Sequence, residues 1–246
     1  MTQDKPDLGE QALSKAVELG ITSQLDEVEG LDVDIRTDPL KLVQGKLDSV
    51  AIAGEGMVMK QDLRVESMEL NTSSVSINPL SIAFGKVELT QPTDATAQIV
   101  LTEADLNRAL SSDYLRQKMQ NLELRIQNRP VAIDVQQAIL GLPGDDRFSL
   151  SASIWLQETQ ETKQFSAVAK PSVQDNGQRI ALEILSAEAQ GLSLDFATAL
   201  FEKLMELLDL RNFELEGISL QLEKLNAYKG KLLLHAFTVV QQIPSF

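Results

Sequence analysis

The 246-residue chain has no cysteine and a single histidine, His235. Without thiols it can have no disulfides, no thiolate nucleophiles and no cysteine-ligated zinc or iron–sulfur sites. One imidazole also excludes metal sites that need two histidines, and leaves only His235 for a Ser-His-acid triad. The Gly-x-Ser-x-Gly turn of serine hydrolases is missing as well. We therefore predict no catalytic residue, and a hydrolase based on His235 is the third of three hypotheses.

Aromatic residues make up only 4% of the chain, and 22 basic residues stand against 36 acidic ones, giving a net charge of -14. Nucleic acids are bound by basic residues that neutralise phosphates and by stacking aromatics, so no nucleic-acid partner is expected. The turn Gly54-Glu55-Gly56 lacks the third glycine of a dinucleotide loop. The adjacent Asp145 and Asp146 lack the alternating ligands of a calcium loop. We predict no cofactor and no metal.

Long apolar runs are absent too. No segment reaches the roughly 18 apolar residues of a membrane-spanning helix, and residues 1–7 have neither the basic start nor the apolar run of a signal peptide. We expect a cytoplasmic protein, with peripheral contact with a membrane surface as a further hypothesis.

Residues 106–130 hold five basic and two acidic side chains. This basic stretch suits anionic headgroups, and the alternative is ordinary solubilising charge.

Hydrophobic residues make up 43% of the chain, and their spacing predicts more strands than helices. Helical spacing occurs at residues 8–19, 102–119 and 193–208. Alternation, or a short apolar run, predicts strands at 31–35, 47–53, 63–70, 75–77, 80–89, 97–101, 122–126, 131–135, 148–156, 165–170, 179–185, 218–225 and 231–240. The alternation slips within residues 63–70, which predicts a bulge and strong curvature. The last strand is apolar on both sides, which predicts that both its faces are covered.

Local signals give the ends of several elements. Thr102 and Asp105 resemble a capping box that starts a helix, which weakens at Ser111-Ser112-Asp113. Asn176-Gly177 lies between two strand patterns and predicts an antiparallel hairpin. These features together indicate an α+β fold built on a highly curved antiparallel sheet. We predict one domain over residues 1–246, or two repeated halves that meet near residues 120–145, because Asn121–Leu124 is similar to Asn212–Leu215 and follows a helix in both places.

The stretch from Ala97 to Leu110, with strand patterns before it and Leu122-Glu123-Leu124 after it, resembles the LmeA-like phospholipid-binding family. The closing stretch from Gly230 to Ala236 is similar to the last strand of that family. The resemblance covers most of residues 8–240. It implies the fold of tubular lipid-binding modules, in which a curved antiparallel sheet wraps around a long apolar helix and an acyl-chain cleft lies between them. Exported members carry a signal or an anchor, and residues 1–7 do not predict either.

The first hypothesis is therefore non-enzymatic binding, and in addition transfer, of phospholipid or another acyl-chain lipid. The cleft would lie along the helix near residues 193–208, the most apolar of the predicted helices. The lining residues predicted for it are Leu200, Leu204, Leu207 and Leu208 from the helix, with Ile154 and Leu234 from strands. A closed core at these positions is the alternative. It fits the second hypothesis, an acidic module that binds a protein partner through its N-terminal helix.

Overall fold

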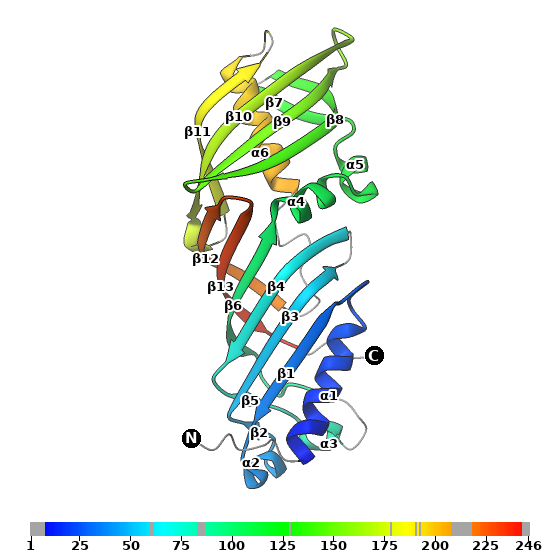
Figure 1. Ribbon diagram of the computed structural model, residues 1–246, viewed down its shortest axis with the longest axis vertical. Coiled ribbons are helices and arrows are strands. Elements are labelled where there is room, and N and C mark those ends of the chain that lie inside the picture. Colours follow the sequence, from blue (N-terminus) through cyan, green and yellow to red (C-terminus); the bar gives the residue numbers. More distant parts are fainter. Residues whose placement is uncertain are drawn as a thin grey trace.

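A computed structural model of the chain describes residues 8–59, 62–82, 87–127, 129–177, 179–189, 191, 193–207 and 218–242. The molecule is elongated, with one sheet toward each end (Figure 1). The helices are α1 (Leu8–Thr22), α2 (Pro39–Val43), α3 (Pro79–Ile82), α4 (Glu103–Leu110), α5 (Asp113–Lys118) and α6 (Leu194–Leu207). This confirms an α+β fold with antiparallel strands.

The strands form two larger sheets and one small ribbon. A six-stranded sheet has the order β1-β3-β4-β6-β13-β12, a five-stranded sheet has the order β11-β10-β9-β8-β7, and β2 pairs with β5. The strands are β1 (Gly30–Arg36), β2 (Lys46–Leu47), β3 (Ser49–Met59), β4 (Leu63–Thr72), β5 (Val75–Ser76), β6 (Thr93–Thr102), β7 (Leu122–Ile126), β8 (Arg129–Gly144), β9 (Arg147–Leu156), β10 (Glu161–Gln174), β11 (Arg179–Ala189), β12 (Ile218–Tyr228) and β13 (Lys231–Val240). The single curved sheet that the pattern suggests is thus divided in two.

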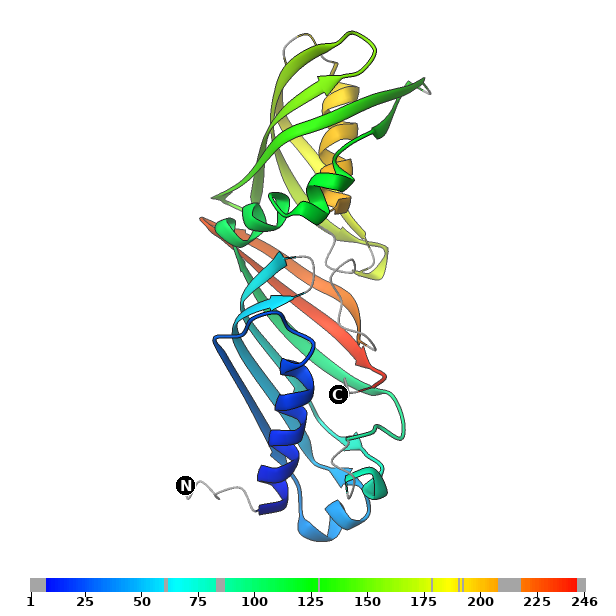
Figure 2. The same ribbon diagram turned by 90° about the vertical axis from the view of Figure 1, so that its right-hand side faces the viewer.

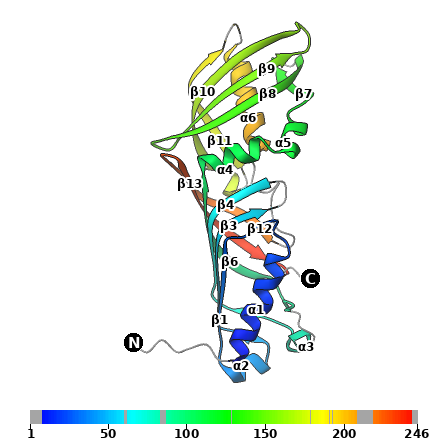
Figure 3. The same cartoon turned by 45° about the vertical axis from the view of Figure 1, so that its right-hand side comes forward.

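Each sheet carries a helix on one face. Helix α1 lies along the six-stranded sheet, which Figure 3 shows nearly edge-on, and buries Leu13, Val17 and Ile21 against strand residues such as Ile35. Helix α6 packs against the five-stranded sheet at the other end of the molecule (Figure 2). Its buried side belongs to a second and larger hydrophobic cluster. The smaller cluster therefore lies beneath α1, whereas the larger one extends from α6 into strands of the six-stranded sheet.

The junction between the sheets is held by backbone pairing. Strands β12 and β13 come from the end of the chain but join the six-stranded sheet, and their connecting turn reaches the five-stranded one: Gly230 N donates to Leu142 O at 2.9 Å. Beside it, Glu103 N on α4 donates to Gly230 O at 3.0 Å. The β8–β9 turn is fixed there too, because Asp146 Oδ1 accepts from Ala227 N at 2.9 Å.

Several local predictions are confirmed. The Thr102 side chain accepts from Asp105 N at 3.1 Å, and Asp105 Oδ2 accepts from Thr102 N at 2.9 Å, so the capping box is present. The weak point after it separates α4 from α5, whose cap is Ser112. At the predicted hairpin Asp175, Asn176 and Gly177 have φ angles of 52°, 53° and 87°, the left-handed region that Asn and Gly tolerate.

Two local predictions are wrong. Residues 79–82 form helix α3 and not a strand, because Pro79 suits a first helical turn and Asn78 Oδ1 accepts from Leu80 N at 3.0 Å. The slip along β4 is not a bulge, since its register with β3 has no shift. Instead Leu63 and Val65 belong to the larger cluster, whereas Leu70 is buried outside both clusters. Register shifts occur in β8, β10 and β12.

The organisation as repeated halves stays a prediction. The second copy of the repeat, Asn212–Leu215, lies outside the described residues, as does Leu208.

Candidate functional site

The apolar interior beside α6 is built from the spacing of its sequence. Phe196, Ala197, Leu200, Phe201 and Leu204 recur at intervals of one, three and four residues, so they share a broad arc of the helix. All five are buried in the larger cluster. The helix begins after Ser193, whose Oγ accepts from Phe196 N at 3.2 Å, and Gln127 Nε2 donates to Asp195 Oδ2 at 3.1 Å. These contacts fix the start of α6 against the β7–β8 turn.

Four of the six predicted lining residues are buried in the larger cluster, which includes strands of both sheets. Leu200 and Leu204 of α6, Ile154 of β9 and Leu234 of β13 all belong to the larger cluster, with exposed fractions of 0%, 1%, 0% and 2%. Leu207 ends α6, but its side chain lies outside the described residues, as does Leu208. The four described side chains are therefore closed to solvent.

The partners of α6 show how this interior is enclosed. The helix contacts the edge strands β7 and β11 as well as β10. A five-stranded sheet that curls has two free edges, and a helix that touches both closes the gap between them. Phe148, Ile154 and Phe165 project from the middle strands into the same cluster. Helix α6 thus packs against the five-stranded sheet at both of its edges.

The opposite face of the six-stranded sheet, away from α1, carries two grooves. We call them the Leu233 groove and the Phe237 groove. The first has a volume of about 550 Å³, with Val100 and Leu233 as its apolar part and Tyr228 beside them. The second, of about 520 Å³, is lined by Phe237, Leu222 and Val173 beside the β10–β11 turn. Both grooves use residues of β13 that alternate with its buried set.

The prediction that β13 is covered on both faces is therefore wrong. Leu232, Leu234 and Ala236 are buried, whereas Leu233 and Phe237 on the other face are only half-buried. The apolar pattern on both sides was the available signal for these grooves. It could not reveal an open face, because periodicity does not show whether another element covers a strand.

The Leu233 groove has more acidic than basic side chains: Glu29, Glu55 and Glu66 against Arg64 and Lys231. Arg64 donates to Glu66 and Glu29 at 2.8 Å each and to Asp105 at 3.0 Å. These hydrogen bonds raise the pKa of Arg64 above its ordinary value, and the bond with Glu66 has the largest effect. Arg64 is therefore held as a cation. Because three carboxylates surround it, this guanidinium is not available to an anionic headgroup.

The predicted basic stretch is also partly engaged within the chain. Arg108 contacts Asp62 at 2.7 Å, Arg116 lies 3.8 Å from Asp113, and the Lys118 ammonium lies 5.6 Å from the centre of the Tyr114 ring. Arg125 and Arg129 lie on the β7–β8 hairpin. The stretch is therefore no single cationic patch for phosphates.

The described residues contain no group of three or more potential metal ligands among His, Asp and Glu. His235 lies half-buried on β13, opposite Gln98 on one side and Lys224 on the other. These neighbours are neither a serine nor a carboxylate. Within the described part of the chain, no helix is long and apolar enough to cross a membrane.

The comparison with known families shows the family of the chain. The model of the family described as LmeA-like phospholipid-binding matches residues 5–237, nearly the whole chain. The chain belongs to this family. No curated protein and no solved structure matches it. The family is described by phospholipid binding and not by a reaction. The apolar interior beside α6 is therefore the candidate site.

Proposed function

We propose that this chain binds phospholipid without catalysing a reaction, and that acyl chains enter between α6 and the five-stranded sheet. Family membership is the observation that carries the lipid ligand. The burial of Leu200, Leu204, Ile154 and Leu234 in one hydrophobic cluster supports the place. In this proposal the sheet wraps around α6 as in tubular lipid-binding modules, and Leu207 and Leu208 extend the lining at the end of the helix.

Uptake requires α6 to part from the sheet, because the four described lining residues are shielded from solvent. A buried methylene group contributes about 0.8 kcal/mol, so a chain of about 12 methylenes contributes roughly 10 kcal/mol before the cost of opening. That cost is limited where α6 contacts edge strands, since β7 and β11 each have only one strand neighbour within their sheet. The bound chain would replace part of the packing between α6 and the sheet.

Native mass spectrometry of the gently purified chain, offered phosphatidylcholine, tests this function. We expect a mass increase of one phospholipid per chain, and affinity that rises with acyl length because more methylenes are buried. Lipids that share a headgroup but have shorter acyl chains are the matched control. The proposal fails if no phospholipid adds at any acyl length. It also fails if affinity follows the headgroup alone.

We extend the proposal to transfer. A chain that encloses acyl groups shields them from water during passage between membranes. Movement of a fluorescent phospholipid from donor to acceptor vesicles should therefore accelerate in proportion to the amount of chain added. An unchanged rate would restrict the function to binding.

The second hypothesis, an acidic module for a protein partner, is favoured by the closed interior but not by the carboxylates of α1. Glu10 Oε1 accepts from Thr37 N at 2.8 Å, and Glu18 accepts from Lys15 at 2.7 Å. Both carboxylates therefore already have partners within the chain. A complex that weakens with salt and with Glu18→Gln, in a chain that takes up no lipid, would favour this hypothesis.

A further inference from the structure

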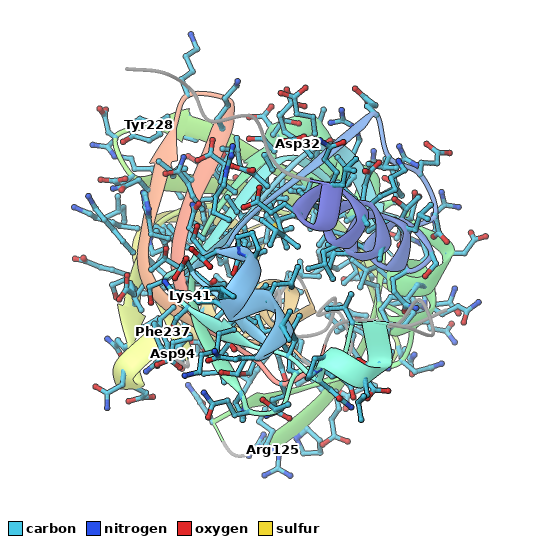
Figure 4. The ribbon with its side chains drawn as sticks, turned by 90° about the horizontal axis from the view of Figure 1, so that it is seen from below. Asp32, Lys41, Asp94, Arg125, Tyr228 and Phe237 are labelled. Atoms are coloured by element: carbon cyan, nitrogen blue, oxygen red, sulfur yellow. The ribbon has the colours of Figure 1, made fainter. Side chains whose placement is uncertain are left out.

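The most exposed large apolar side chains gather at the end of the molecule opposite α6. Leu8, Val43, Leu40 and Leu80 have exposed fractions of 85%, 78%, 75% and 75%, higher than those of all other exposed large apolar residues in the described part of the chain. They belong to the start of α1, to α2 and to α3, which lie together at one end in Figures 1 and 2. We call these four residues the apolar tip. Figure 4 views this end along the long axis.

The apolar tip is held by hydrogen bonds that leave its side chains outside. Asp38 Oδ1 accepts from Leu40 N at 2.8 Å, and Ile77 N donates to Gly45 O at 2.7 Å, which joins α2 to the segment that leads into α3. Leu40 and Val43 are three residues apart on α2 and share a face, while Leu42 turns toward the smaller cluster. The local fold therefore separates an inward leucine from two outward apolar residues.

The charges around Leu40, Val43 and Leu80 balance within their own segments, although the whole chain has a net charge of -14. Segment 38–48 holds two acidic residues and two lysines, and segment 75–82 holds no charged residue. Lys41 contacts Asp48 at 2.6 Å, which neutralises both. Two segments without net charge, from which apolar side chains protrude, are suited to a surface that is itself apolar beneath a zwitterionic layer.

We propose that the apolar tip inserts into the interfacial region of a phospholipid bilayer. A protein partner of ordinary affinity needs a complementary face of about 800 Å². The apolar tip instead presents separate side chains from three helices at the narrow end of the molecule, and not one continuous face. A bilayer needs no such complementarity, because its acyl chains adapt to each side chain. The ligand class of the family also resides in bilayers. Docking in this way places α6 and the five-stranded sheet at the end remote from that surface.

Flotation of the full chain with phosphatidylcholine vesicles tests this proposal. The triple variant Leu40→Ser, Val43→Ser and Leu80→Ser should lower vesicle binding by about tenfold or more, because three apolar side chains no longer leave water. The matched control is the double variant Ile139→Ser and Leu185→Ser, which alters exposed apolar residues of the five-stranded sheet. The control should bind vesicles like the unaltered chain, and binding should persist at high salt because segments 38–48 and 75–82 have no net charge.

Quenching of tryptophan fluorescence by brominated lipid measures the insertion. Trp155, the single tryptophan, lies on β9 in the five-stranded sheet, so brominated phosphatidylcholine should not quench it. With Trp155→Phe as background, Leu40→Trp should be quenched by the same vesicles. Unchanged binding of the triple variant, no binding of the unaltered chain, or loss of binding in salt would each overturn the proposal. So would a dimer of the unaltered chain that the triple variant converts to monomers without vesicle binding.

Docking at the apolar tip and lipid binding beside α6 can be tested independently of each other. The triple variant should still add one phospholipid in native mass spectrometry, since the apolar tip is far from α6 (Figure 1). Loss of vesicle binding with retained lipid addition supports docking. Loss of lipid addition in the triple variant, with its thermal unfolding unchanged, would contradict the separation of the two sites.

Discussion

Helices α1 and α6 each cover one face of a sheet, yet they do so in different ways. Helix α1 buries a narrow row, Leu13, Val17 and Ile21, and keeps Leu8 and Leu19 exposed. Helix α6 instead buries a broad arc that includes two phenylalanines, Phe196 and Phe201. A narrow row is typical of a surface helix, whereas a broad arc is typical of a helix enclosed by its sheet. The comparison explains why the proposed acyl site lies beside α6 and the proposed docking site at the start of α1.

The largest effect on stability is expected at α6. Phe201→Ala should lower the free energy of unfolding by about 4 kcal/mol, because a fully buried aromatic ring is lost and a cavity remains. Chemical denaturation measures this change in the free energy of unfolding. Leu194→Ala on the same helix is the control, since Leu194 is exposed, and it should change stability by less than about 0.5 kcal/mol. Similar losses for both variants would contradict the enclosed position of α6.

A somewhat smaller loss is expected at α1. Leu13→Ala should lower the free energy of unfolding by about 3 kcal/mol, because Leu13 is buried in the smaller cluster. Since Leu13 and Phe201 belong to different clusters, the loss in the double variant should equal the sum of the single losses within about 0.5 kcal/mol. Strong coupling between the two sites in chemical denaturation would show that the two ends share one core.

The capping box at the junction should contribute less than either cluster. Thr102→Ala removes the side-chain oxygen that accepts from Asp105 N and should lower stability by about 1 kcal/mol. Ser111→Ala, at the exposed end of the same helix, is the matched variant and should leave the unfolding midpoint nearly unchanged. If both variants have the same unfolding midpoint, the cap does not stabilise α4.

The smallest effect on stability is expected at the apolar tip. Leu40→Ser should change the free energy of unfolding by less than about 0.5 kcal/mol, because its side chain is 75% exposed. A thermal unfolding curve that overlays that of the unaltered chain is the expected result. A clear loss of stability would mean that Leu40 packs against the protein and is not free to enter a bilayer.

The elements were predictable where local spacing determines them. Apolar residues at intervals of three and four give α6, and Thr102 with Asp105 gives the start of α4. Strand partners were not predictable, because β6 pairs with β13 from the far end of the chain and pairing of this kind leaves no local pattern. Helix α3 was missed because the cap at Asn78 overrides an apolar run that also suits a strand.

Spacing predicts which residues beside α6 are buried, but not whether they line a space. The apolar arc of α6 and the alternation in β9 and β13 indicate buried residues, and Leu200, Ile154 and Leu234 are buried in the larger cluster. Whether they enclose a space or contact one another depends on side-chain volumes across several elements, which spacing does not encode. The apolar tip had no separate signal, since Leu40 and Val43 resemble core residues in a sequence.

The central claim, that acyl chains enter between α6 and the five-stranded sheet, is tested most directly by joining the two. The chain has no cysteine, so Gln127→Cys and Asp195→Cys, whose native side chains are hydrogen-bonded, can be linked by a short reducible bis-thiol reagent without competing thiols. Native mass spectrometry with phosphatidylcholine then compares the linked and the reduced protein. We expect the linked form to lose lipid addition and the reduced form to regain it. Equal lipid addition to both forms would show that acyl chains do not enter beside α6.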